Sequence, residues 1–172
     1  MNKFSKMVLV GMVLSTSVQA QDSVKVECDR IRGYCTTSVR FEHINNSDDP
    51  SLRLHTFAVR SENLTNRLAE MVRPVTMMFV SSGRSWRYLH YNDVQFLLDD
   101  TIRLDPKEEH DGRVNDGVLE FITVRFTMDQ FKKIVEASTV VGVIGGTTFN
   151  LTTEQVAHLK SLAVHLTNQN NK

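Results

Sequence analysis

The sequence has few of the features that identify an enzyme or a nucleic-acid-binding protein. Its 172 residues carry 20 basic and 20 acidic side chains, so no basic excess is present to attract nucleic acid or an anionic membrane. It contains no Gly-x-Ser-x-Gly nucleophile elbow, no phosphate-binding glycine loop, no dinucleotide fingerprint and no His-Glu-x-x-His zinc motif. The sequence therefore predicts no catalytic residue, no cofactor and no metal ion, although a catalytic site assembled from distant residues stays open.

Long apolar runs are scarce as well, and the clearest one lies at the start of the chain. Residues 7–14 are apolar but too few to span a bilayer, which takes about 20 residues. Lys3 and Lys6 precede this run, and Val18 and Ala20 place small residues at the −3 and −1 positions of a cleavage site. Residues 1–20 are therefore predicted to be a Sec-type signal peptide cleaved after Ala20. The mature protein is expected to be periplasmic or secreted, with no membrane span.

The chain has only two cysteines, Cys28 and Cys35, and both follow the predicted cleavage site. An even number of cysteines in an oxidising compartment predicts a disulfide bond between them. A redox-active pair is the alternative, but it usually has Cys-x-x-Cys spacing near a helix N-terminus, and this pair has neither. We therefore expect a structural disulfide that joins strand-like runs at residues 24–28 and 36–44.

Two helix starts in the second half share one pattern, a threonine followed three residues later by a glutamine. Thr127 with Gln130 and Thr152 with Gln155 each match a capping box, in which the two side chains satisfy free backbone amides at a helix N-terminus. The flanking apolar residues add a hydrophobic staple to each box. Helices are therefore predicted to begin at Thr127 and Thr152.

Strand patterns surround these helices. Residues 118–126 read as an inner strand, and two β-branched runs meet at Gly145-Gly146, which supplies the positive φ angles of a tight hairpin. Residues 118–166 therefore form a predicted β-α-β-β-α unit. The remaining strand-like runs are at residues 52–60, 74–80, 94–98 and 101–104, the last two joined by a tight turn at Asp99-Asp100, whereas 105–117 read as an exposed polar loop.

The predicted fold class is α+β. We expect one domain over residues 21–167, with an antiparallel-rich sheet of about six to eight strands. The two helices of the second half pack on one face of that sheet. Residues 168–172 are expected to be a frayed tail.

Joined together, these elements resemble the C-terminal parts of small exported bacterial proteins of unknown function. The resemblance rests on residues 99–104, 118–130 and 151–155 together with the glycine hairpin, so it covers residues 99–172. It implies an exported α+β protein and carries no catalytic residue to transfer.

The most distinctive surface chemistry is predicted in residues 84–91. In an extended chain Trp86, Tyr88 and His90 share one face, and Arg84 can lie beside them. Aromatic faces with arginines stack on sugars or bases, or anchor a protein partner, so these four are the predicted ligand-binding or partner-binding residues. The alternative is that Trp86 and Tyr88 lean into the edge of the core, as the high average burial of large aromatic residues favours.

Other polar clusters give weaker signals. The acidic residues at 99, 100, 105, 108, 109 and 111 lack the ligand spacing of a calcium loop and are interpreted as solvated turn residues. His158 and His165 are two helical turns apart, about 10 Å along the axis, which is long for one metal ion. The sequence thus favours an exported, non-catalytic protein that binds an envelope partner protein or a glycan. The alternatives are a small hydrolase using His90 with Asp93 or Asp99, or His158 with His165, and a structural subunit of a surface assembly.

Overall fold

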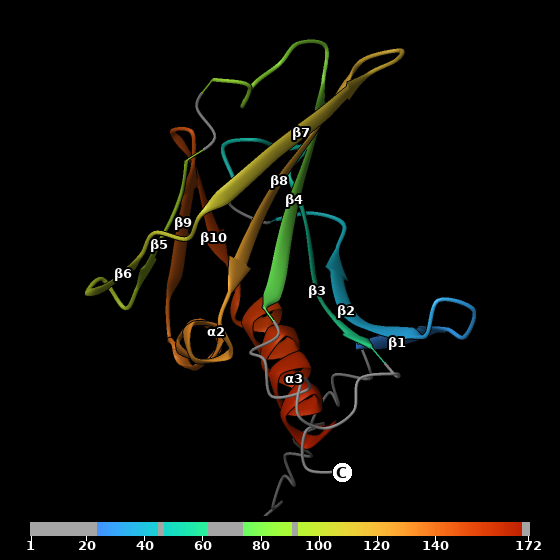
Figure 1. Cartoon of the computed structure of the whole chain (residues 1–172). Coiled ribbons are helices and arrows are strands. Elements are labelled where there is room, and N and C mark those ends of the chain that lie inside the picture. Colours follow the sequence, from blue (N-terminus) through green and yellow to red (C-terminus); the bar gives the residue numbers. More distant parts are fainter. Residues whose placement is uncertain (1–23, 45–46, 62–73, 91–92, 170–172) are drawn as a thin grey trace, which may run out of the picture.

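The computed structural model describes residues 24–44, 47–61, 74–90 and 93–169, which form two antiparallel sheets and two helices (Figure 1). The six-stranded sheet has the order β1 (Lys25–Asp29), β2 (Tyr34–Phe41), β3 (Arg53–Ser61), β4 (Val75–Gly83), β8 (Val118–Phe126), β7 (Glu108–Val114). The four-stranded sheet has the order β10 (Thr147–Leu151), β9 (Val140–Ile144), β5 (Val94–Leu98), β6 (Ile102–Leu104). The helices are α2 (Met128–Glu136) and α3 (Thr153–Gln169). The predicted α+β class is confirmed, and the expected signal peptide lies outside the described residues.

The core lies between the two sheets. Along β4 and β8, alternate residues such as Met77, Phe79 and Ile122 are fully buried, while their neighbours are partly exposed, as the period of a strand requires. Phe79 contacts Phe149 of the second sheet at a ring-centroid distance of 5.1 Å, and Phe96 of β5 also belongs to this aromatic cluster. Figure 1 shows the second sheet standing beside the long strands β4 and β8.

Both predicted capping boxes are present. The Thr127 hydroxyl accepts from the Gln130 amide at 3.2 Å, and the Gln130 side chain accepts from the Thr127 amide at 2.9 Å. Thr152 and Gln155 make the same reciprocal pair at the start of α3. Because these contacts are local, the helix starts could be predicted without knowledge of the tertiary fold.

The two predicted tight turns are also confirmed. Gly145 and Gly146 have φ angles of 52° and 87°, and they join β9 to β10. Asp99 and Asp100 have positive φ angles too, at 48° and 55°. The Asp99 carboxylate accepts from the backbone amides of Ser138 and Thr139, which ties the β5–β6 turn to the start of β9.

Three expectations were wrong in part. Part of the expected polar loop at residues 105–117 is strand β7, which pairs with β8 from Glu108↔Val124 to Val114↔Val118. Its charged side chains hide the strand pattern in the sequence, and charges of this kind protect an edge strand from pairing with other chains. The strands also divide between two sheets, because a strand pattern does not specify its partners. Helix α3 continues to Gln169, so residues 168 and 169 of the expected tail are helical.

The predicted disulfide between Cys28 and Cys35 is confirmed. The two cysteines lie directly opposite each other in the β1–β2 ladder, so the bond closes the hairpin that turns at Gly33. A disulfide of this kind is typical of oxidising compartments. No described helix has both the length and the apolar character needed to cross a bilayer.

Candidate functional site

Residues 84–90 follow β4 as a bent segment and form neither helix nor strand. The side chains of Trp86, Tyr88 and His90 therefore do not share one face as they would in an extended chain. Tyr88 is fully buried, Trp86 is 37% exposed, and Arg84 and His90 are exposed. Tyr88 is therefore a buried core residue, whereas the other three predicted binding residues, Arg84, Trp86 and His90, are accessible to solvent.

A buried carboxylate on β8 fixes the backbone of this segment. Glu120 is only 2% exposed, and its two oxygens accept from the amides of Arg87 and Tyr88, each at 2.8 Å. His110 of β7 lies 3.2 Å from the same carboxylate through Nε2. A buried carboxylate without such partners would be strongly unfavourable, so these contacts specify one position for the segment.

A second buried carboxylate holds the same segment from the other side. Asp49, in the connection between β2 and β3, is 1% exposed and accepts from Tyr88 OH at 3.0 Å and Ser81 Oγ at 2.7 Å. Its other oxygen accepts from the Ser51 amide and hydroxyl, and Arg87 forms an ion pair with it at 3.1 Å. Burial raises the pKa of Asp49, but the hydrogen bonds from Ser81, Ser51 and Tyr88 outweigh burial and hold it below its usual value.

Tyr88, which lies at the centre of this network, has a raised pKa. Burial is the main cause that raises the pKa of Tyr88 to about 12, and the negative charge of Asp49 adds to the effect. Below pH 10 the hydroxyl is neutral in both the folded and the unfolded chain. Because the pKa is higher in the folded state, the stabilising contribution of this proton is lost as the pH rises from 10 towards 12.

We therefore predict an alkaline loss of stability that depends on Tyr88. A shift of this size corresponds to roughly 2–3 kcal/mol between pH 10 and about 12. Urea unfolding across this pH range should show that the free energy of unfolding declines more steeply with pH in the unmodified protein than in Tyr88→Phe, which has no hydroxyl to titrate. Lysines and other tyrosines titrate in both proteins, so the difference isolates Tyr88. Parallel declines would contradict the prediction.

Trp86 rests on the strand at the sheet edge. Its ring lies edge-on to His110, with centroids 6.1 Å apart, and covers Gly112 of β7. A Cβ atom at Gly112 would lie only 2.2 Å from the indole ring, so this glycine makes room for Trp86. We use "Trp86 surface" for the exposed side chains of Arg84, Trp86, Arg87, Leu89 and His90.

The supporting residues Asp49, Glu120, His110 and Gly112 were not singled out from the sequence. One signal was present: Glu120 occupies the face of strand 118–126 that otherwise carries Val118, Ile122 and other apolar residues. A carboxylate on a buried face needs partners, and this alone indicates a polar network. The contacts of Asp49 cross 32 and 39 residues to Ser81 and Tyr88, so no local pattern could reveal them.

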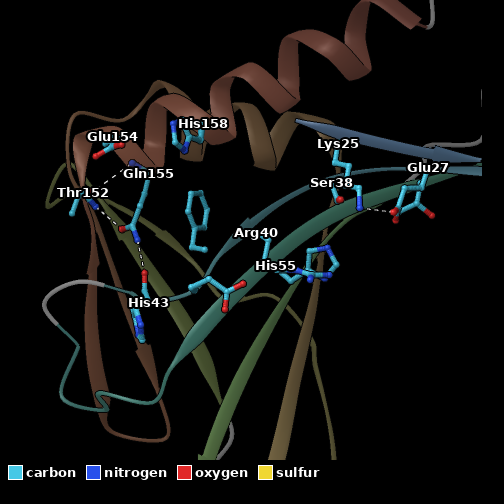
Figure 2. A pocket seen from close by; sticks show the side chains of 13 residues that line it. Lys25, Glu27, Ser38, Arg40, His43, His55, Thr152, Glu154, Gln155 and His158 are labelled. Atoms are coloured by element: carbon cyan, nitrogen blue, oxygen red, sulfur yellow. Dashed lines mark hydrogen bonds and ion pairs between the residues drawn. The ribbon is translucent and has the colours of Figure 1, made fainter. Parts of the chain in front are cut away.

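A separate groove of about 540 Å³ lies between β1 and β2 on one side and the start of α3 on the other (Figure 2). His158 of α3 stacks on Phe41 with a ring-centroid distance of 6.0 Å and points into this space. His55 of β3 also lines the groove, and its Nε2 is buried without a hydrogen-bond partner in the described part of the chain. Burial, together with the nearby charge of Arg40, lowers the pKa of His55.

The polar pairs considered for hydrolysis are placed as follows. The Asp99 carboxylate accepts hydrogen bonds from the backbone amides of Ser138 and Thr139, and His158 lies against Phe41. Within the described residues, no three His, Cys, Asp or Glu side chains are grouped so that they could hold a metal ion. Comparison with known proteins gives no match to a family model, a curated protein or a solved structure.

Proposed function

We propose that this protein is exported by a cleaved signal peptide and binds a partner protein or a glycan of the cell envelope through the Trp86 surface. The disulfide Cys28–Cys35 supports an oxidising compartment, and the N-terminal pattern of residues 1–20 supports export. Binding, rather than catalysis, is favoured because the exposed groups of the Trp86 surface are aromatic, basic and aliphatic. Such groups provide contact area and hydrogen bonds to a ligand.

The observation that carries this proposal is that two buried carboxylates hold residues 84–90 in one position. Two nearly inaccessible carboxylates, Asp49 and Glu120, bind the adjacent residues Arg87 and Tyr88. This arrangement holds Trp86 in place before any ligand arrives, which lowers the entropy lost on binding. A tryptophan flanked by arginines is the composition of an interface hot spot and of a stacking platform for sugars.

The test is capture from an envelope extract of the natural host. The Trp86→Ala variant should retain at least tenfold less of the ligand than the unmodified protein, with a melting temperature within a few degrees of it. Leu97→Ala is the matched control, because Leu97 is also 37% exposed but lies on β5. Protease treatment of the extract separates a protein ligand, which is destroyed, from a glycan, which survives. Equal capture by the unmodified protein and the Trp86→Ala variant would refute the proposal.

A second variant displaces the indole without removing it. In Gly112→Ala the new methyl group collides with the Trp86 ring, so we expect the ring to move outward and capture to fall at least tenfold. Trp86 is the only tryptophan, so its fluorescence emission should shift to longer wavelength as the ring becomes more exposed. Gly83→Ala is the control, because its Cβ would meet nothing closer than 3.5 Å. An unchanged emission maximum in Gly112→Ala would contradict this account of the Trp86 environment.

A further inference from the structure

The groove beside α3 has a polar surface that the register of the sheet brings together. Thr36, Ser38 and Arg40 occupy alternate positions of β2, so their side chains leave the same face of the strand. Glu27 lies opposite Thr36 in the β1–β2 ladder, and His55 lies opposite Arg40 in the β2–β3 ladder. Directly opposite residues of a ladder share a face, and all of these side chains line the groove. Hydroxyl, ionic and imidazole groups are thus gathered on one surface.

The start of α3 completes the lining. Glu154 and His158 are four residues apart on the helix, so they project to the same side, and both line the groove. Gln155 accepts from the Thr152 amide and donates from Nε2 to the backbone oxygen of His43 at 2.9 Å, as Figure 2 shows. These contacts tie the helix start to the chain that follows β2. The groove is therefore bordered by parts of the fold that hold each other in place without a ligand.

The charges around the groove cancel. A hollow of about 190 Å³ adjoins the groove, and the two together are lined by three carboxylates and three cationic side chains: Glu27, Glu42, Glu154, Lys25, Arg40 and Arg53. Lys25 and Glu27 form an ion pair at 2.6 Å. Arg40 and Glu42 are two residues apart, at most about 7 Å between their Cα atoms, so each weakens the field of the other. A ligand with a net charge of either sign would therefore meet repulsion as well as attraction.

Hydrogen bonding can select a ligand where net charge cannot. The Arg40 guanidinium only donates, a carboxylate such as Glu42 only accepts, and the Ser38 hydroxyl does both. A ligand that pairs with all of them needs closely spaced donors and acceptors. Each hydroxyl group is a donor and an acceptor at once, and a sugar ring carries several on adjacent carbons. Hydrogen bonds to ionised groups are also stronger than those between neutral groups.

An aromatic pair and the size of the groove fit the same class of ligand. The rings of His158 and Phe41 are nearly parallel, at 5°, with centroids 6.0 Å apart, and both residues line the groove. Flat ring faces of this kind pack against the C–H groups of a sugar ring. The groove volume of about 540 Å³ falls among pockets that hold small ligands, which span about 300–1,000 Å³. A disaccharide can therefore be accommodated.

We propose that this groove binds a neutral oligosaccharide, whose hydroxyl groups accept from Arg40 and donate to Glu42 and Glu154, while a sugar ring packs against His158. The site is distinct from the Trp86 surface, because β1 and β2 lie at one edge of the six-stranded sheet and β7 lies at the other. Binding in the groove does not depend on the function proposed for the Trp86 surface.

The test adds neutral disaccharides to the isotope-labelled mature chain and follows its amide chemical shifts. The panel is maltose, cellobiose, lactose, mannobiose and N,N′-diacetylchitobiose, each at millimolar concentration. At least one should shift the amides of residues 36–43 and 152–158. Arg40→Ala and Glu42→Ala should each weaken its binding at least tenfold without unfolding the protein, because both side chains are exposed. Arg103→Ala is the matched control, because Arg103 is an exposed arginine on β6 in the other sheet.

Analogues of the bound disaccharide test the basis of recognition without altering the protein. Methylation of every hydroxyl removes the donors and keeps the acceptor oxygens, so the methylated sugar should bind at least tenfold more weakly. Analogues that carry one carboxylate or one ammonium group should also each bind at least tenfold more weakly than the neutral sugar. Equal or tighter binding of either charged analogue would overturn the proposal, because net charge would then select the ligand.

Two further results would overturn the proposal. One is that no disaccharide of the panel shifts residues 36–43 and 152–158. The other is that a disaccharide shifts the indole resonance of Trp86 and leaves the amides of the groove unchanged. The second result would support glycan binding at the Trp86 surface while removing it from the groove. Capture that is lost in Trp86→Ala does not involve the groove, so the two proposals can fail independently.

Discussion

Replacing Asp49 with alanine should lower the free energy of unfolding by about 3–5 kcal/mol. The change removes the acceptor for Tyr88 OH, Ser81 Oγ and both donors of Ser51; Tyr88 and Ser81 are buried, and Ser51 is partly buried. Each unsatisfied buried donor costs about 1–3 kcal/mol, but the losses are not additive because the groups can partly re-pair. Ser51 and Ser81 are 3.2 Å apart and can bond to each other.

Urea unfolding of the variant and of Asp48→Ala would check this prediction. Asp48 is the neighbouring residue with the same charge, but it is exposed and its carboxylate accepts one hydrogen bond, from the Thr148 amide. Its replacement should therefore cost about 1 kcal/mol or less. If both variants lost the same small amount, the buried network would contribute little to stability.

The network also predicts a response to acid. The hydrogen bonds that lower the pKa of Asp49 stabilise its charged form in the folded state. This contribution is fully present above the usual pKa of an aspartate and is lost as the pH falls through the lower value in the folded protein. At acid pH, the free energy of unfolding of the Asp49→Ala variant should therefore decline less steeply than that of the unmodified protein. This effect lies at the opposite end of the pH range from the effect of Tyr88.

The elements that could be predicted from the sequence are those fixed by contacts a few residues apart. Thr127 with Gln130, and Gly145 with Gly146, set a helix start and a turn through local geometry, and both predictions are confirmed. Strand β7 could not be predicted because both of its faces are partly or fully exposed, so its charged sequence has no apolar alternation. The division into two sheets depends on pairings such as β5 with β9, which join residues about 45 positions apart and leave no local signature.

The candidate site, like the fold, could be predicted from the sequence only where local features determine it. The composition of residues 84–90 drew attention to Trp86 and its arginines, but their environment comes from β7, β8 and the connection after β2. An extended chain was the wrong geometry for this segment, because Glu120 binds two successive amides and so bends the backbone around its carboxylate. Tyr88 consequently faces inward. Its removal would test the core rather than the surface, and this is why Trp86→Ala alone is the informative variant.

Gly142 of β9 is the second position where we expect a large effect, because it has an aromatic residue on either side of it in the sheet. It lies opposite Phe149 in the β9–β10 ladder and opposite Phe96 in the β5–β9 ladder. A Cβ atom at Gly142 would come within 2.0 Å of the Phe149 ring, which is fully buried and contacts both Phe79 and Phe96. The ring covers the glycine backbone, so the missing side chain is part of the core packing.

Gly142→Ala should therefore lower the free energy of unfolding by about 2–3 kcal/mol, the upper part of the range for overpacking a core. Gly83→Ala, with nothing closer than 3.5 Å to the new Cβ, should change it by less than about 0.5 kcal/mol. A double-mutant cycle gives the decisive measurement: Phe149→Leu leaves room for the methyl group, so the combined variant should lose at least about 1 kcal/mol less than the sum of the single variants. Additive losses would show that the alanine methyl group does not meet Phe149, and that the cost of Gly142→Ala arises from the backbone of β9 instead.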